Sequence, residues 1–228
     1  MFDYEVVVIE SYIDNMLNEQ ASSYMGKIWN FKKDMYSSAH GELSNIIDID
    51  DFYCTHVVFI NKVTREVLMT FKYIDYDACS KASVDFPLIK HAAYQSDVLY
   101  NSVCEYISKI KRSGGRISYS GGWCMDNKVK SPKMRLMLIQ AYVCIHYLEQ
   151  VNKNYSFITG IGVKEVGTIN FFNRNFHTVP IVNELVELSG VGSIHGCFLS
   201  ASIEQLSICG TKNMHKYKPV WDSRTIIG

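Results

Sequence analysis

The sequence predicts a mixed α/β fold with a partly antiparallel sheet flanked by helices, and two stretches of the chain carry this prediction. Residues 56–61 and 66–73 are strand-like runs joined by a short polar connection, which is typical of an antiparallel hairpin. Further along, residues 116–125, 133–150 and 156–163 have the order strand, helix, strand. A hairpin followed by alternating strands and helices indicates a mixed sheet covered by helices.

The composition is that of a globular protein with its own core. Hydrophobic residues make up 47% of the 228 residues and charged residues 20%. The chain contains only four prolines and no linker-like stretch that would mark a boundary. We therefore expect one domain over residues 1–228.

Charge and cysteine content exclude several classes of protein. The 23 basic and 23 acidic residues balance, so nothing indicates a nucleic-acid partner. The seven cysteines are widely spaced and form no C-x-x-C pair, which favours reduced thiols in a cytoplasmic protein and no metal. The most apolar stretch, residues 136–148, is too short for a membrane span, and we expect none.

The first part of the chain predicts a strand and then helices. Residues 5–9 form a β-branched run, which favours a strand. Residues 14–35 carry apolar side chains at helical spacing and predict one or two helices. After the hairpin, residues 85–111 read as helix, at least from Ser96 onward, with Val98 and Leu99 on its apolar face. Gly114 and Gly115 end that helix.

The middle of the chain contains the most specific pattern. The strand 116–125 is interrupted by Gly121 and Gly122, and glycines inside a strand often mark a bulge or a splay. Ser131 and Pro132 then suit a helix start, as N-cap and first-turn residue. The helix 133–150 is apolar nearly all round, which indicates burial against a sheet. A strand over 156–163 and a short aromatic helix over 168–176 follow. The tail has strand-like pieces around 180–186 and 197–208.

This order of elements resembles that of the GNAT superfamily of acyltransferases. The counterparts of its bulged fourth strand, its phosphate-gripping turn and its terminal short helix are residues 118–126, 130–135 and 170–176. The resemblance covers the layout from Glu5 to Phe176. It implies that residues 1–228 form a single GNAT-like acyltransferase domain.

Within that superfamily, the sequence is most similar to the autoinducer (acyl-homoserine lactone) synthases and the N-acyl amino acid synthases. Asp50-Asp-Phe-Tyr53, the hairpin and Lys72 resemble their acidic-aromatic entry, hairpin and basic residue, which is an arginine in those families. Trp123 and Asp126 match the aromatic and acidic positions of their fourth strand.

Two departures lie on that same strand. Tyr119 stands where those families carry glutamate, and Gly121-Gly122 stand where they carry a Ser-Arg pair.

The resemblance implies transfer of an acyl group from a CoA or acyl-carrier-protein thioester to an amine acceptor, either an amino acid or another small amine. The donor is thus acyl-CoA or a phosphopantetheine thioester, and an acyl-carrier protein is a possible partner. Backbone N–H groups of the splayed strand would polarise the thioester carbonyl, and the following helix N-terminus would bind the donor phosphate. The predicted donor-binding residues are Lys130, Ser131, Lys133, Met134, Arg135 and Asn170.

Two readings of the basic turn stay open. Lys128, Lys130, Lys133 and Arg135 are cations near a helix N-terminus, where the helix dipole favours acids, and this suits an anionic ligand. A solvated basic loop explains them equally well. The turn also lacks the glycine-rich form usual in GNAT enzymes, and Pro132 has no N–H to offer.

The predicted catalytic residues are Tyr119, Trp123, Cys124 and Asp126. A carboxylate or histidine would take the proton of the attacking amine, and the candidates are Asp126, Glu165 and His177. Tyr119 or Tyr142 would protonate the departing thiolate, although half-buried packing is the ordinary role of a tyrosine.

Two alternatives to acyl transfer stay open. One is a catalytically inactive GNAT-like binding or regulatory module, motivated by the missing glutamate and arginine. The other is a cysteine-dependent hydrolase using Cys124, with His146 or His177 as base. Burial of Cys124 as an inert thiol is the competing explanation.

Overall fold

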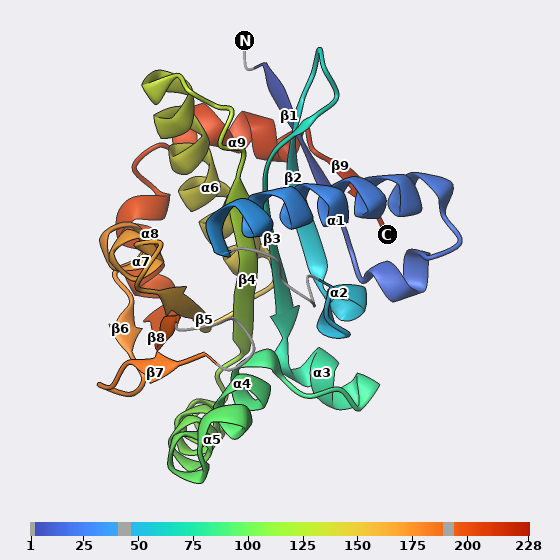
Figure 1. The fold of residues 1–228 in the computed structure, drawn as a ribbon. Coiled ribbons are helices and arrows are strands. Elements are labelled where there is room, and N and C mark those ends of the chain that lie inside the picture. Colours follow the sequence, from blue (N-terminus) through green and yellow to red (C-terminus); the bar gives the residue numbers. More distant parts are fainter. Residues whose placement is uncertain (1–2, 41–46, 189–193) are drawn as a thin grey trace. The chain divides into compact units, whose positions relative to one another are not determined.

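The computed structural model describes residues 3–40, 47–188 and 194–228, which fall into two compact units (Figure 1). The first unit consists of Met1–Tyr73, Gly121–Tyr142 and His215–Gly228, and the second of Ile74–Ser120 and Val143–Met214. Strand β4 (Ile117–Met125) and helix α6 (Pro132–Asn152) contribute residues to both. One domain over the whole chain stays a prediction.

The first unit is built on an antiparallel arrangement of β1 (Tyr4–Ile9), β2 (Thr55–Asn61) and β3 (Val67–Asp75). The short strand β9 (Thr225–Ile227) pairs with β1 in parallel. The predicted first strand and hairpin are therefore confirmed. Every residue of β3 except the last is buried, which explains its nearly continuous apolar sequence.

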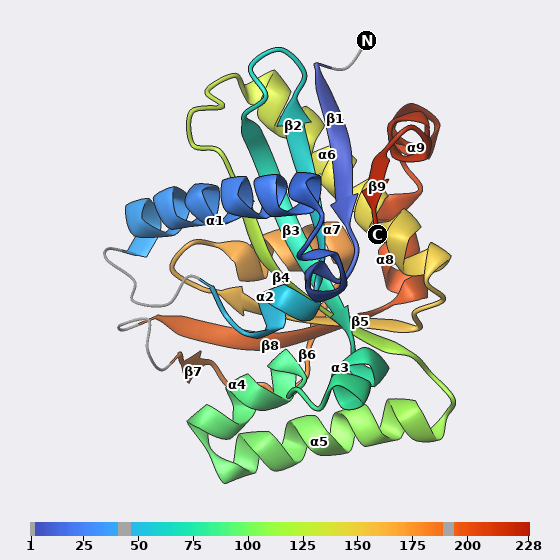
Figure 2. The same cartoon turned by 90° about the vertical axis from the view of Figure 1, so that its right-hand side faces the viewer.

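Helix α1 (Glu19–His40) crosses one face of these strands (Figures 1 and 2). Met25 and Ile28 of α1 are fully buried in one cluster with Val7, Val58 and Ile60 of the strands. Each such side chain stabilises the fold by roughly 1.5–3 kcal/mol through burial. The helical spacing of the apolar residues in this segment thus has a direct cause in packing.

Three aromatic rings hold α1 against two short helices, η1 (Tyr12–Asn15) and α2 (Asp50–Tyr53). The ring centroids of Tyr12 and Trp29 lie 5.8 Å apart, and Phe52 lies 5.8 Å from Trp29 and 6.0 Å from Tyr12. Such pairs add roughly 0.5–1.5 kcal/mol beyond their burial. This cluster fixes α2, the helix that carries Asp50 and Asp51.

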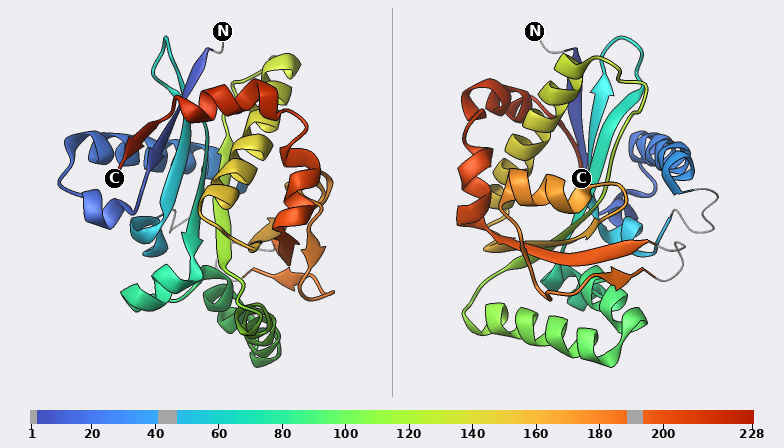
Figure 3. Two further views of the ribbon diagram at one scale, coloured as in Figure 1. Left: turned by 180° about the vertical axis from the view of Figure 1, so that it is seen from behind. Right: turned by 60° about the vertical axis from the view of Figure 1, so that its left-hand side comes forward.

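Helix α6 begins at Pro132 as predicted, and Ser131 is its N-cap. The Ser131 hydroxyl accepts a hydrogen bond from the Met134 N–H at 3.4 Å. Helix α9 (Met214–Asp222) lies against the first part of α6, where the Tyr217 hydroxyl donates to Gln140 Oε1 at 3.1 Å (Figure 3). Residues 141–150 of α6 are buried almost throughout, which explains why that part of its sequence is apolar on most sides.

The second unit begins its sheet with the first residues of β4, which pair in parallel with β5 (Phe157–Val163). Strand β8 (His195–Ser202) pairs antiparallel with β5, and the two-residue strands β6 (Val179–Pro180) and β7 (Val186–Glu187) pair with β8. Both parallel and antiparallel pairs therefore occur, as the predicted fold class requires.

The helices of the second unit differ from the prediction in three places. The expected helix over 85–111 is divided into α4 (Pro87–Gln95) and α5 (Asp97–Arg112). Ser96 is extended between them, and its hydroxyl caps α5 at the Leu99 N–H. This break moves Val98 into the first turn of a new helix, where it is 77% exposed instead of on the apolar face.

The other two differences also arise from capping side chains. The segment 197–208 is a strand only as far as Ser202, which starts α8 (Ile203–Gly210) through a capping box with Gln205. Helix α3 (Tyr76–Ala82) was not predicted, and the Asp75 carboxylate caps it by accepting from the backbone of Asp77 and Ala78. Helix α7 (Thr168–Phe176) has the predicted bounds.

Together the two units confirm a mixed α/β architecture with helices against a partly antiparallel sheet. Within the described ranges, no helix combines the length and the apolar composition that crossing a membrane would need.

Candidate functional site

Four charged side chains are buried together in the first unit. Lys32 comes from α1, Asp50 and Asp51 from α2, and Lys72 from β3, and their exposed fractions are 3%, 5%, 0% and 8%. Two cations and two carboxylates make the group neutral overall. Burial of unpaired charge is costly, so this balance is a condition of its stability. We call these four residues the ion cluster.

Asp51 is the centre of the ion cluster. Its Oδ1 accepts from Lys72 Nζ at 2.8 Å and from Lys32 Nζ at 3.1 Å. Its Oδ2 accepts from the backbone N–H of Asp48 at 2.9 Å. Lys72 Nζ also donates to Asp50 Oδ2 at 2.6 Å. Lys72 thus bridges both carboxylates of α2, and Lys32 forms a second ion pair with Asp51.

The ionised forms are favoured despite burial. Burial alone would raise the pKa of Asp51, but the charges of Lys72 and Lys32 outweigh it and hold that pKa well below its usual range. Burial would likewise lower the pKa of Lys72, but the neighbouring carboxylates of Asp51 and Asp50 raise it well above the ordinary lysine value. The cluster therefore carries both signs of charge at neutral pH.

Two neutral groups border the ion cluster. The ring of His56 is buried, and its Nε2 lies 2.7 Å from the carbonyl oxygen of Asp51, so the neutral imidazole donates there. Burial lowers the pKa of His56 to about 4, against the opposing charge of Asp51. Burial also raises the pKa of the Cys54 thiol. Neither group carries charge at pH 7.

Gly122 on β4 provides room for the Lys72 side chain. A Cβ at this glycine would come within 3.2 Å of Lys72 Cγ and 3.5 Å of Cδ. Gly122 also has φ +61°, a left-handed conformation that disfavours other residues. Strand β4 itself continues through Gly121 and Gly122, so what the structure shows at this place is a left-handed residue within the strand, which leaves room for the Lys72 side chain.

Of the two predicted catalytic residues that follow Gly122, Trp123 is half-buried among aromatic rings and Cys124 is buried. Trp123 lies 6.0 Å from Tyr142 and Tyr142 lies 4.9 Å from Phe71, measured between ring centroids. Cys124 is 6% exposed, and burial raises its pKa to about 12. A thiol of that pKa is almost wholly protonated at neutral pH, which counts against a nucleophilic role.

Asp126 is held at the end of β4 by its own turn. Its N–H donates to the Leu68 carbonyl at 2.9 Å, and its Oδ1 accepts from the Lys128 N–H at 2.8 Å. Beyond it, Lys130, Lys133 and Arg135 are exposed, and Met134 is half-buried. The basic side chains predicted around the turn thus reach solvent near the N-terminus of α6.

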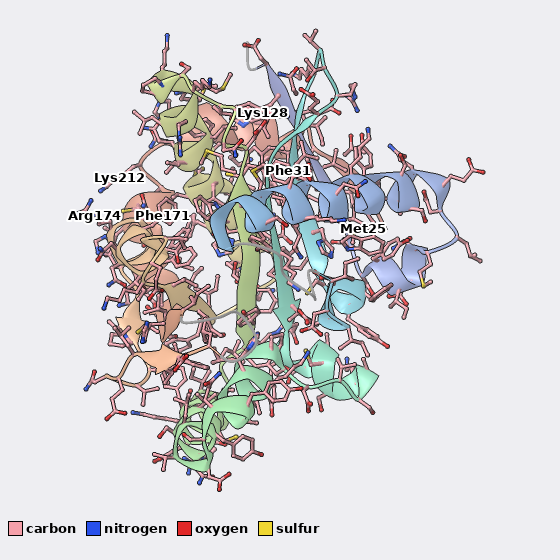
Figure 4. The ribbon with its side chains drawn as sticks, in the orientation of Figure 1. Met25, Phe31, Lys128, Phe171, Arg174 and Lys212 are labelled. Atoms are coloured by element: carbon pink, nitrogen blue, oxygen red, sulfur yellow. The ribbon has the colours of Figure 1, made fainter. Side chains whose placement is uncertain are left out.

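A hollow of about 300 Å³ lies beside this turn. Figure 4 labels two of its lining residues, Phe31 on α1 and Lys128 after β4. Its charged and polar lining residues are Lys27, Asn30, Asp34, Arg65, Glu66, Asp126 and Lys128, and its apolar ones are Phe31, Met35 and Val67. Asp126 and Lys128 therefore belong both to the turn and to the hollow.

No protein-family model matches the sequence, and no curated protein matches it. Solved structures match it in fold. FeeM, an N-acyl amino acid synthase from uncultured soil microbes, has a TM-score of 0.58 at 10% identity, covering 90% of this chain and 93% of its own. BjaI, a CoA-dependent acyl-homoserine lactone synthase solved with SAM and isopentyl-CoA, has 0.57 at 12% identity, covering 98% and 92%.

A ribosomal-protein-S5-alanine acetyltransferase from Vibrio fischeri matches with a TM-score of 0.50 at 10% identity, covering 90% of this chain and 95% of its own. The chain has a GNAT-like fold. These neighbours are named as acyl-transferring enzymes, and the similarity at such low identity concerns the fold.

The GNAT-like fold places the sequence-predicted residues in different surroundings. Tyr119 is 7% exposed in the second unit, with its ring 6.2 Å from that of Phe86. Asn170 is exposed on α7. Glu165 is engaged by His195, whose backbone N–H and ring Nδ1 lie 3.0 and 2.8 Å from its carboxylate. The roles of Tyr119 and Asn170 stay predictions.

Asp50, Asp51 and Lys72 carry part of the family resemblance, whereas Lys32 and His56 were not predicted from the sequence. Lys32 follows Ile28 by four positions and therefore lies on the apolar face of α1. A lysine at a core-facing position was the available signal. His56 lies in a β-branched strand sequence, and nothing in that sequence indicates that its side chain is buried beside Asp51.

Proposed function

We propose that this protein transfers an acyl group from a CoA or acyl-carrier-protein thioester to an amine. The observation that carries the proposal is the shared position of Asp126 and Lys128, which belong to the basic turn before α6 and also line the hollow. A donor site and an acceptor site would then meet at one turn. The GNAT-like fold, common to the named acyl-transferring enzymes, supports the same conclusion.

The turn and the start of α6 would bind the phosphate groups of the donor. Backbone N–H groups in the first turn of a helix and the positive end of its dipole favour an anion. Lys130, Lys133 and Arg135 add three exposed positive charges there. Ser131 and Met134 would shape the turn, because the Ser131 hydroxyl caps the Met134 N–H.

The hollow would bind the acceptor. It is lined by three cations, three carboxylates and three apolar side chains. An amino acid, with an amine, a carboxylate and a side chain, matches this mixture of charges. Asp126 would accept the proton of the amine as the nitrogen attacks the thioester carbonyl carbon, while the carbon–sulfur bond breaks and the thiol leaves.

The test is donor binding to the triple variant K130A/K133A/R135A. We expect the dissociation constant for CoA, measured by calorimetry, to rise at least tenfold. The variant K81A/K109A/R112A removes the same charges from exposed positions of the second unit and should bind like the wild type. Equal binding by the two variants would remove the proposed donor site.

The second candidate function is a binding module without catalysis. Tyr119 and Gly121-Gly122 stand where the resembling families carry glutamate and Ser-Arg, and these departures favour it. A panel of amino acids and amines with acetyl-CoA and long-chain acyl-CoA separates the two functions. Binding without turnover supports the module. Turnover that falls at least a hundredfold in Asp126→Asn supports the transferase.

The structure lends no support to a hydrolase using Cys124, because that thiol is buried and its pKa is about 12.

A further inference from the structure

A second group of titratable side chains lies in the second unit, where α7 and α8 end. Cys209 Sγ lies 3.5 Å from His177 Nε2 and 3.7 Å from Lys212 Nζ. The same sulfur lies 3.7 Å from the carbonyl oxygen of Arg174. Figure 4 labels Arg174 on α7 and Lys212 just beyond α8. A thiol, an imidazole and an ammonium group thus meet at one place.

The two helices build this group through their own end structures. His177 follows the last residue of α7 with φ 51°, which turns the chain away from the helix. Its carbonyl accepts from Gln205 Nε2 at 3.0 Å, and Gln205 also closes the capping box that starts α8. Cys209 follows Gln205 by four positions, one helical turn later on the same side of α8. Helix α8 therefore carries the Cys209 thiol and, through Gln205, also holds the backbone of His177.

Cys209 differs from the cysteines of the core. Burial raises the pKa of the Cys54, Cys124, Cys144 and Cys197 thiols. Cys209 is only half-buried, and His177 and Lys212 beside it are exposed. A thiolate is the reactive form of cysteine, and neighbouring cationic side chains stabilise it. Accessibility and basic neighbours occur together at this position.

We propose that Cys209, His177 and Lys212 form a thiol modification site that reacts with low-molecular-weight disulfides. His177 Nε2 takes the proton of Cys209, in the tautomer that carries its own proton on Nδ1, and Lys212 stabilises the thiolate. The thiolate attacks one sulfur of R–S–S–R. The Cys209–S–S–R bond forms, the reagent S–S bond breaks, and R–S⁻ leaves with the electron pair and is protonated. Cys209 is oxidised and one half of the reagent is reduced.

The test is reaction of the folded protein with an aromatic disulfide that releases a coloured thiolate, followed by peptide mapping. Cys104 on α5 is the internal control, because it is also half-buried but its neighbour is the Tyr100 hydroxyl. We expect Cys209 to react at least tenfold faster than Cys104 at pH 7. Cys209→Ser should remove the fast phase, and Cys104→Ser should retain it.

Two further variants separate activation from simple exposure. His177→Asn preserves a residue type tolerated in the left-handed conformation, and Lys212→Met preserves length without charge. Each should slow the labelling of Cys209 at least threefold, while rates in concentrated urea stay equal to the wild type. The proposal would be overturned if Cys104 were labelled before Cys209. It would also be overturned if the labelling rate of Cys209 were unchanged in the double variant H177N/K212M. None of these outcomes depends on acyl transfer.

Discussion

The side chain of Lys72 on β3 lies beside Gly122 on β4, at the residue where the backbone of that strand is left-handed. A Cβ on Gly122 would lie 3.2 Å from Lys72 Cγ, closer than most real contacts of that kind. Gly122 therefore has a structural role here. It leaves the space through which Lys72 reaches Asp50 and Asp51.

Gly122→Ala should destabilise the protein more than an ordinary glycine substitution. The left-handed backbone alone costs an alanine roughly 1–2 kcal/mol. The matched control is Gly114→Ala, because Gly114 has φ +76° with open space around it. We expect Gly122→Ala to lose about 1 kcal/mol more than this control in urea unfolding, through displacement of Lys72. Equal losses of unfolding free energy in the two variants would mean that the Lys72 side chain moves aside without an energetic cost.

Removing one charge from the ion cluster should be strongly destabilising. Lys72→Met leaves Asp50 and Asp51 buried with only Lys32 to balance them, and breaking a buried pair in this way costs about 3–5 kcal/mol. Adding Asp50→Asn to Lys72→Met restores neutrality and should recover part of that loss. Both variants can be compared with the wild type by chemical denaturation.

The control for charge removal is Lys218→Met. Lys218 pairs with Asp222 at 2.6 Å on the surface, with both side chains more than half exposed. Exposed pairs contribute little, so we expect a change within about 0.5 kcal/mol. A loss from Lys72→Met no larger than this would show that the cluster does not stabilise the fold.

Acidification from pH 7 to pH 5 should destabilise the protein through two buried histidines. Burial lowers the pKa of His56 to about 4 and that of His146 to about 3, from an ordinary 6.5. The unfolded chain therefore binds protons in this range that the folded chain does not, and stability falls as pH falls. Each histidine contributes a loss of about 2 kcal/mol between pH 7 and pH 5. Urea unfolding at pH 7 and at pH 5 measures the sum of the two losses.

The same two pH values test the assignment to these residues. Asp51 has a lowered pKa, so its stabilisation is lost only below its unfolded value of 3.8 and does not enter this range. The double variant H56Q/H146Q should show a correspondingly smaller loss. Histidine ring resonances of the wild type provide an independent measurement, and protonation of either ring above pH 5 would contradict the assignment.

Local patterns were sufficient to predict most of the fold. The β-branched runs and the Ser131 cap act over a few residues, and each appears in the structure as expected. The division of the 85–111 helix was missed because the Ser96 cap overrode a continuous apolar pattern. The start of α8 had a readable signal, since Ser202 and Gln205 have capping-box spacing.

The candidate site was less predictable because its contacts are tertiary. Lys32 and Asp51 are separated by 19 positions and lie on different helices. A lysine in a helix is ordinarily solvated, and only the packing of α1 on the strands shows that Lys32 is buried. The hollow beside Asp126 likewise depends on side chains from α1 and β3 that share no motif with the turn.

Two glycines in helices should respond in opposite ways to the same substitution. Gly26 lies within α1, and a Cβ there would meet nothing within 4 Å. Gly26→Ala should stabilise the protein by roughly 0.5–1 kcal/mol, because alanine loses less backbone freedom than glycine.

Gly210 ends α8, and a Cβ there would lie only 2.4 Å from Tyr147 Cβ. Gly210→Ala should destabilise by about 1–3 kcal/mol through overpacking against α6. A rise of the denaturant midpoint in both variants would show that helix propensity, not the contact with Tyr147, decides the effect.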